Sequence, residues 1–258
     1  MQVNLNADLG EGFGAYDIGN DLAMLDIVGA ASIACGFHAG DASVMHRVVQ
    51  QAQQRGVSIG AHPGFNDLWG FGRRPIEMRA DDLEYMIAYQ IGALQAIASY
   101  AGTKVTHVKA HGALSNMAAV RPDYALAIGR AIRTVDASLI YVAIGGTEME
   151  RAGESLGLPV AREAFVDRLY EDDGTLTPRR IAGAVITDPT AAAERAVRMV
   201  REQVVIARSG AVLPRRIDTL CVHGDEATGV VVARAAREAL SGAGIRLVTL
   251  PEMLAGPG

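Results

Sequence analysis

The segment Ser32-Ile-Ala-Cys-Gly-Phe-His-Ala-Gly-Asp41 contains the pattern that decides the fold. Its apolar first half predicts a strand, and the strand ends abruptly in a polar, glycine-rich tip. After Asp41, apolar side chains recur at helical spacing until Gly56 provides a stop signal. The order of strand, polar tip and helix is typical of one unit of an α/β fold.

The same order recurs at three more histidines along the chain. His62, His111 and His223 each follow a short apolar run, and each has a glycine within its next two residues, as His38 has. Parallel α/β folds gather polar groups at the carboxyl ends of their strands. We therefore expect these histidines to meet at one site.

Strands and helices alternate along the whole chain, which predicts a (β/α) barrel, seven-stranded, as a single domain over residues 1–250 with a loose tail over 251–258. A doubly wound open sheet is the alternative. The barrel is favoured because polar candidates follow nearly every strand. Strands are expected over 2–7, 31–35, 57–61, 105–109, 139–144, 159–163, 218–222 and 245–249. The main helices are expected over 20–29, 42–55, 81–101, 122–134, 189–207 and 226–242.

The composition supports this class and excludes several partners. Of the 258 residues 50% are hydrophobic but only 5% aromatic, which suits parallel strands covered by helices. The net charge of −5 argues against nucleic acid or an anionic membrane as a partner. Cys35 and Cys221 are too far apart for a CxxC motif, and no apolar run reaches membrane-spanning length. We expect a cytoplasmic protein.

The first strand ends at Asn6 and Asp8, with Glu11 close behind. Two neighbouring carboxylates can divide the roles of general acid and general base. The alternative is that they cap loop amides. In the same way, Asp41 can serve the site or simply cap the helix that it opens, and Cys35 can be a nucleophile or a small buried side chain.

The four histidines at the strand tips can bind a divalent metal or act as hydrogen-bonding and acid–base groups. The sequence has no HxH or HExxH spacing, so a metal is not favoured. Lys109 stands at the end of an otherwise apolar strand, where an ammonium can neutralise an oxyanion or a phosphate. Two long loops, over 63–79 and 167–180, carry Arg73, Arg74 and Arg168, which can clamp a carboxylate.

Seven motifs resemble those of the LamB/YcsF family, in the family's order and over residues 1 to about 248. They are Asn4-Leu-Asn-Ala-Asp-Leu-Gly-Glu11, Ala34-Cys-Gly-Phe-His-Ala-Gly-Asp41, Gly60-Ala-His-Pro63, Gly70-Phe-Gly-Arg-Arg74, Lys109-Ala-His-Gly-Ala-Leu114, Phe165-Val-Asp-Arg168 and Cys221-Val-His-Gly-Asp225. The resemblance implies a barrel related to the glycoside hydrolase and polysaccharide deacetylase barrels. It also implies ATP-dependent opening of 5-oxo-L-proline to L-glutamate by a 5-oxoprolinase assembly that includes two partner subunits, B and C.

Within that reaction we expect ATP with Mg²⁺ to act through the complex, and self-association into a homo-oligomer is a further option. Asp8 or Glu11 is the expected base, His62 or His111 the acid, and Lys109 the partner of an oxyanion or phosphate. The expected substrate-binding residues are Asn6, His38, Asp41, Arg73, Arg74, Arg168, His223 and Asp225.

Two other functions fit the same residues. The chain can be a stand-alone, metal-dependent amide hydrolase or sugar deacetylase, or a regulatory or carrier protein that binds a ligand without chemistry. The sequence contains no GxxxxGK[ST] phosphate-binding loop. We therefore expect that the chain alone does not turn over 5-oxoproline.

Overall fold

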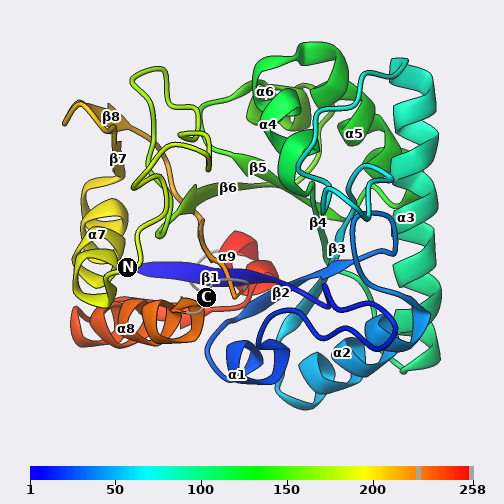
Figure 1. Ribbon diagram of the computed structural model, residues 1–258, viewed down its shortest axis with the longest axis horizontal. Coiled ribbons are helices and arrows are strands. Elements are labelled where there is room, and N and C mark those ends of the chain that lie inside the picture. Colours follow the sequence, from blue (N-terminus) through cyan, green and yellow to red (C-terminus); the bar gives the residue numbers. More distant parts are fainter. Residues whose placement is uncertain (225–227, 256–258) are drawn as a thin grey trace.

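The computed structural model, which describes residues 1–224 and 228–255, confirms the barrel. Seven parallel strands form a ring that closes because the last strand pairs with the first (Figure 1). These strands are β1 (Gln2–Leu9), β2 (Ala30–Ala34), β3 (Ser58–His62), β4 (His107–Lys109), β5 (Ile140–Ile144), β6 (Val160–Phe165) and β9 (Thr219–Val222). An eighth parallel strand, β10 (Arg246–Val248), pairs with the first residues of β1. All carboxyl ends of the ring therefore open at one end of the barrel.

Helices surround the ring of strands (Figure 1). Their apolar stripes pack on the outward-facing strand residues, as Leu83, Ile87 and Leu94 of α3 show by being fully buried. The helices are α1 (Asp21–Leu25), α2 (Ala42–Gln54), α3 (Ala80–Tyr100), α4 (Gly112–Val120), α5 (Pro122–Val135), α6 (Glu148–Ser155), α7 (Pro189–Glu202), α8 (Gly229–Gly242) and α9 (Leu250–Ala255). Within the described part of the chain, none of them combines the length and the apolar character needed to cross a bilayer.

The charged side chains inside the barrel lie toward one end of it. Because side chains alternate along a strand, Leu5 of β1 joins the layer under the helices while Asn6 and Asp8 point into the barrel. The amino-terminal end is filled by a separate apolar cluster of Ala30, Ile140, Val142, Ala161 and Leu250, with Leu254 packed against it. Figure 1 shows α9, in red, at the middle of the ring. The charged groups Asp8, Lys109 and Glu163 therefore face the carboxyl ends of the strands.

Helix α9 occupies a segment that the sequence led us to expect as loose. The backbone N–H of Thr249 donates to Oε2 of Glu252 at 2.8 Å, and the N–H of Glu252 donates to Oγ1 of Thr249 at 3.5 Å. This reciprocal pair is a capping box, and Pro251 stands in the first turn, where proline is tolerated. The expectation of a loose tail was wrong for 251–255, because Thr249 and Glu252 form a helix start signal. Residues 256–258 lie outside the described part.

Helix α4 was not predicted at all. It opens with Gly112 and has no side-chain cap, so the sequence gives no start signal there. The backbone becomes extended at Arg121, which precedes a proline and therefore avoids the helical region. Pro122 then begins α5, the helix that the sequence did predict.

The helix predicted over 189–207 ends earlier, at Glu202. Gln203 adopts a left-handed conformation with φ of 53°, which breaks the helix. The chain continues as an antiparallel hairpin of β7 (Val204–Ile206) and β8 (Val212–Pro214), which was not predicted. The first helix is also shorter than its predicted range of 20–29.

Candidate functional site

A cleft of about 520 Å³ opens at the carboxyl ends of the strands. Its lining includes most of the residues selected from the sequence, and they come from β1, β4, β9 and the two long loops. These residues are Asp8, Glu11, Arg73, Lys109, His111, Arg168 and His223. The structure therefore brings together side chains that are more than 200 positions apart in the chain, as the strand-tip pattern predicted.

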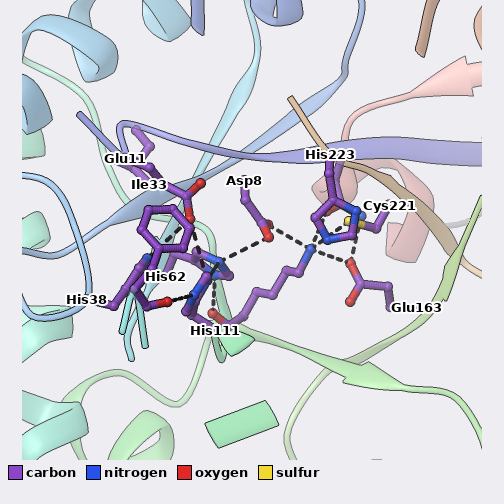
Figure 2. A network of polar contacts seen from close by, with 12 residues as sticks. Asp8, Glu11, Ile33, His38, His62, His111, Glu163, Cys221 and His223 are labelled. Atoms are coloured by element: carbon purple, nitrogen blue, oxygen red, sulfur yellow. Dashed lines mark hydrogen bonds and ion pairs between the residues drawn. The ribbon is translucent and has the colours of Figure 1, made fainter. Parts of the chain in front are cut away.

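Lys109 lies at the floor of this cleft and is only 4% exposed. Its ammonium is 2.8 Å from Oδ1 of Asp8 and 2.8 Å from Oε1 of Glu163, and it donates to Oδ1 of Asn6 at 3.0 Å (Figure 2). Burial alone would lower the pKa of Lys109, but the charges of Asp8 and Glu163 and the hydrogen bond to Asp8 outweigh burial and raise it well above its usual value. Lys109 is therefore a permanent cation with its donors already engaged.

Asp8 bridges Lys109 and the histidines. Its Oδ2 atom is 3.2 Å from Nε2 of His62 (Figure 2), whereas its other oxygen, Oδ1, contacts Lys109. Burial would raise the pKa of Asp8, but its interactions with His62 and Lys109 outweigh burial and hold the pKa well below the usual value. The cleft floor therefore presents an ionised carboxylate that is almost removed from bulk water.

Three histidines and Glu11 form a compact group beside Asp8. Nδ1 of His111 lies 3.0 Å from Nε2 of His62 and 3.5 Å from Oε1 of Glu11, while Nε2 of His38 lies 3.3 Å from the same glutamate oxygen. The rings of His38 and His111 stack with centroids 3.7 Å apart. Burial lowers the pKa of His38 and that of His111 well below the usual value, so both rings are neutral.

Backbone groups fix two of these rings. Nδ1 of His62 donates to the carbonyl of Lys109 at 2.7 Å, and Nε2 of His111 donates to the carbonyl of Phe71 at 2.8 Å. Two glycines make the necessary space, because a Cβ on Gly64 would lie 2.6 Å from Nδ1 of His38 and a Cβ on Gly72 would lie 2.6 Å from Cβ of His38. Gly64 is the glycine that follows His62 in the strand-tip pattern, and Gly72 belongs to the motif Gly70-Phe-Gly-Arg-Arg74, so the sequence analysis had already marked both.

His223 is held by a partner that sequence reasoning missed. Asp167 accepts both from the backbone N–H of His223 and from its Nδ1, each at 2.9 Å. Burial would raise the pKa of Asp167, but the contacts with His223 outweigh burial and lower it. The pair fixes the imidazole so that His223 lines the cleft.

Arginines form the mouth of the cleft. Arg73 comes from the first long loop, and Arg168, Arg179 and Arg180 come from the second. Burial lowers the pKa of Arg168 to about 10, which leaves it charged at neutral pH, and it donates to the carbonyl of Thr177 at 2.7 Å. A positively charged mouth suits the anionic group of a ligand.

Other candidates lie outside the cleft wall. Asp41 caps α2 through the N–H groups of residues 43 and 44, and Arg74 pairs with Asp67. His38 contacts Glu11 and His62 contacts Asp8, and Glu11 and Asp8 are the residues of these pairs that line the cleft. Asn6 accepts a hydrogen bond from Lys109. Asp225 falls outside the described residues.

Glu163 is the most important residue that was not selected from the sequence. It stands on β6, paired in register with Ile144 of β5, and its carboxylate points at Lys109 (Figure 2). Arg162 stands directly before it in the same strand, so the sequence does not mark Glu163 as an isolated charge.

Comparison with known proteins identifies the family of this chain. A model of the LamB/YcsF family matches residues 3–255. A protein of Bradyrhizobium diazoefficiens, named as an A subunit of 5-oxoprolinase (number 2), is 52% identical over 246 residues, which cover 95% of this chain and 96% of that protein. A protein of Rhodopseudomonas palustris, named as the A subunit of 5-oxoprolinase, is 54% identical over 244 residues, which cover 94% of this chain and 96% of the relative.

Solved structures agree with this relationship. The lactam utilization protein from Thermus thermophilus superposes with a TM-score of 0.91 at 43% identity, covering 96% of this chain and 100% of that chain. A deacetylase solved with substrate has a TM-score of 0.51 at 14% identity, covering 100% and 92%, and so shares the predicted barrel fold alone. The family match over almost the whole chain and the identity to its members show that this chain belongs to the LamB/YcsF family.

Proposed function

We propose that this chain is the A subunit of an ATP-dependent 5-oxoprolinase and that its cleft opens the ring of 5-oxo-L-proline to L-glutamate. The observation that supports the proposal most is the ionised Asp8 at the cleft floor, held between Lys109 and His62 beneath a mouth of arginines. The names of close relatives support the same reaction. Partner subunits B and C and ATP with Mg²⁺ complete the activity.

The chemistry explains why such a cleft is needed. A lactam carbonyl is stabilised by resonance and resists water, so ring opening needs an activated oxygen, a base for the water and an acid for the leaving nitrogen. The overall change consumes ATP and water and yields glutamate, ADP and phosphate. Phosphorylation of the lactam oxygen by ATP supplies the activation and releases ADP. Water then adds to the ring carbon, the C–N bond breaks to leave an acyl phosphate, and a second water releases phosphate to give glutamate.

Asp8 is the base in this scheme. It lines the cleft, it is ionised, and its position is fixed from both sides by Lys109 and His62. Lys109 is a positioning residue, because its donors are already directed to Asp8, Glu163 and Asn6 and cannot turn to an oxyanion. Glu11 lines the cleft beside Asp8.

His223 is a better acid than His62 or His111, the residues that the sequence suggested for this role. His62 and His111 each donate their single N–H to a backbone carbonyl when neutral, so neither has a proton to give to the substrate. His223 is oriented through Nδ1–H by Asp167, which leaves Nε2 as the nitrogen that takes up a proton and passes it to the leaving amine, with the Asp167 carboxylate balancing the charge in between. Arg73 and Arg168 hold the substrate carboxylate at the mouth.

A stand-alone, metal-dependent amide hydrolase is the second candidate. The group of Glu11, His38, His62 and His111 favours it, because its ligand atoms lie within 4.8 Å of one another. This candidate requires amide hydrolysis by the chain alone and without ATP, whereas the main proposal requires the partner subunits.

The experiment is glutamate release from 5-oxoproline by the reconstituted three-subunit complex at saturating ATP. Asp8→Asn should reduce kcat by roughly two to four orders of magnitude, the usual contribution of a positioned base. Asp81→Asn, which changes an exposed carboxylate in the first turn of α3, is the matched control and should keep full activity. An Asp8→Asn complex that assembles and works at the normal rate would refute the proposed base.

A further inference from the structure

The histidines beside Asp8 lack a proton for one of the hydrogen bonds that their positions suggest. His62 directs its Nδ1–H to one backbone carbonyl and His111 directs its Nε2–H to another. In the neutral rings, the remaining nitrogens, Nε2 of His62 and Nδ1 of His111, are therefore both acceptors. These two atoms face each other at 3.0 Å, a distance at which two neutral rings in these tautomers have no proton to share, so the contact calls for a cation or an added proton between them.

Further acceptors point at the same place. Oε1 of Glu11 lies 3.5 Å from Nδ1 of His111, and Nε2 of His38 lies 3.3 Å from that oxygen. Nδ1 of His38, which is buried, has no hydrogen-bond partner in the described structure, so the contact of Nε2 with Glu11 is the one that bears on that ring's tautomer. All four residues are at most 5% exposed, and water cannot readily relieve this crowding of lone pairs.

We propose that Glu11, His38, His62 and His111 form a binding site for one divalent transition-metal ion of the zinc class. Imidazole nitrogens with one carboxylate are the ligands that Zn²⁺ and its neighbours prefer. The inference goes beyond the proposed function and does not depend on it, because binding can be measured without any activity.

The distances between the ligand atoms suit such an ion. Two ligands about 2.1 Å from a tetrahedral ion lie roughly 3.4 Å apart, and octahedral neighbours lie roughly 3.0 Å apart. The observed separations of 3.0, 3.3 and 3.5 Å match these values. The ring nitrogens of His62 and His111 that face away from the cluster donate to backbone carbonyls, which is the usual outer arrangement of metal-binding histidines.

The site also lies at the wall of the cleft, where a bound ion would be next to a substrate. Glu11 and His111 line the cleft, and Oδ2 of Asp8 is 3.2 Å from Nε2 of His62. An ion held here would supply a Lewis acid at the cleft wall. The rival explanation is a proton rather than a metal, since an extra proton on Nε2 of His62 would also satisfy the facing acceptors.

Metal titration of the full chain separates these two possibilities. The purified protein is stripped with a chelator and titrated with Zn²⁺ against a chromogenic competitor, and the bound metal is counted by mass spectrometry. We expect one equivalent for the wild type and a roughly hundredfold or larger loss of affinity for His62→Ala and His111→Ala. The control is His46→Ala on α2, a histidine outside the cluster, which should bind like the wild type.

Two measurements on the same samples cover the case in which a variant folds poorly. Co²⁺ bound to the wild type should show visible d–d absorption of nitrogen and oxygen ligation, and Zn²⁺ should raise the Tm of the wild type but not that of His111→Ala. Absence of stoichiometric binding by the wild type would overturn the proposal, as would equal loss in His46→Ala. A doubly protonated His62 in ¹⁵N NMR of the metal-free protein, with no metal uptake, would assign the site to a proton instead.

Discussion

The ammonium of Lys109 lies 2.8 Å from Asp8 and 2.8 Å from Glu163, so one buried cation joins the carboxylates of β1 and β6 across the inside of the barrel. A buried ion pair is weak evidence that the pair stabilises the fold. Removal of one member nevertheless destabilises the fold strongly, because the remaining charges stay buried without a partner. This asymmetry gives the first prediction.

Lys109→Met should destabilise the fold by about 3–5 kcal/mol, since it leaves Asp8 and Glu163 without their cation. Urea unfolding followed by circular dichroism measures the change. Lys104→Met removes an exposed lysine just before β4 and should unfold like the wild type. Adding Glu163→Gln to Lys109→Met should recover part of the loss. If Lys109→Met were as stable as Lys104→Met, the three charges would not be coupled as described.

A second prediction concerns the glycines under the histidines. Gly64→Ala places a methyl group 2.6 Å from Nδ1 of His38 and should displace that ring, lowering both stability and activity of the complex. Gly92→Ala is the matched control, because nothing lies within 4 Å of its added Cβ on α3. That control should stabilise the helix by about 0.5–1 kcal/mol. Equal thermal melting of the two variants would contradict the close packing at Gly64.

The sequence predicted the barrel and the shared site because both depend on local signals. The strands ending at His62 and Lys109 could be read from short apolar runs followed by polar tips, and parallel strands must bring such tips together. Glu163 and Asp167 could not be chosen in this way. Their importance comes from contacts with Lys109 and His223, which belong to distant segments and are visible only after the ring closes.

The missing proton between Nε2 of His62 and Nδ1 of His111 could not be predicted from the sequence either. It arises because carbonyls of Lys109 and Phe71 fix the tautomers, and no motif spacing records which carbonyl a ring will meet. The absence of HxH or HExxH spacing therefore says little about a site assembled from separate strand tips. Asp41 shows the reverse case, since its cap of α2 could be predicted from its position alone.

A third prediction is a loss of stability in mildly acidic solution. Burial lowers the pKa of His107 to about 3, whereas the unfolded chain keeps the usual histidine value of 6.5. Between these two pKa values His107 is protonated in the unfolded state but not in the folded state. The free energy of unfolding therefore falls as pH decreases below 6.5. The contribution of one such group is at most about 1.4 kcal/mol per pH unit.

The measurement is urea unfolding of the chelator-treated chain between neutral and mildly acidic pH. His107→Gln should show a shallower decline than the wild type, because it removes one of the groups that the unfolded state protonates. His46→Gln changes a half-buried histidine of α2 and should keep the wild-type slope. Identical slopes for wild type and His107→Gln would show that His107 is not held neutral by burial.

A fourth prediction concerns the division of labour between subunits. The chain alone, with ATP and Mg²⁺, should not release glutamate from 5-oxoproline, because its sequence has no GxxxxGK[ST] loop to hold a triphosphate. Adding subunits B and C should restore the reaction. Robust glutamate formation by the isolated chain would place the nucleotide in this barrel and would overturn the proposed assignment.

The most direct test of the proposed function is a crystal structure of the assembled complex with 5-oxo-L-proline bound. We expect the lactam ring in the cleft of this chain, with its ring carbonyl next to Asp8 and its carboxylate at Arg73 or Arg168. His223 should lie within hydrogen-bond reach of the ring nitrogen. A ligand bound in one of the partner subunits, with this cleft occupied only by water, would contradict the claim that ring opening takes place here.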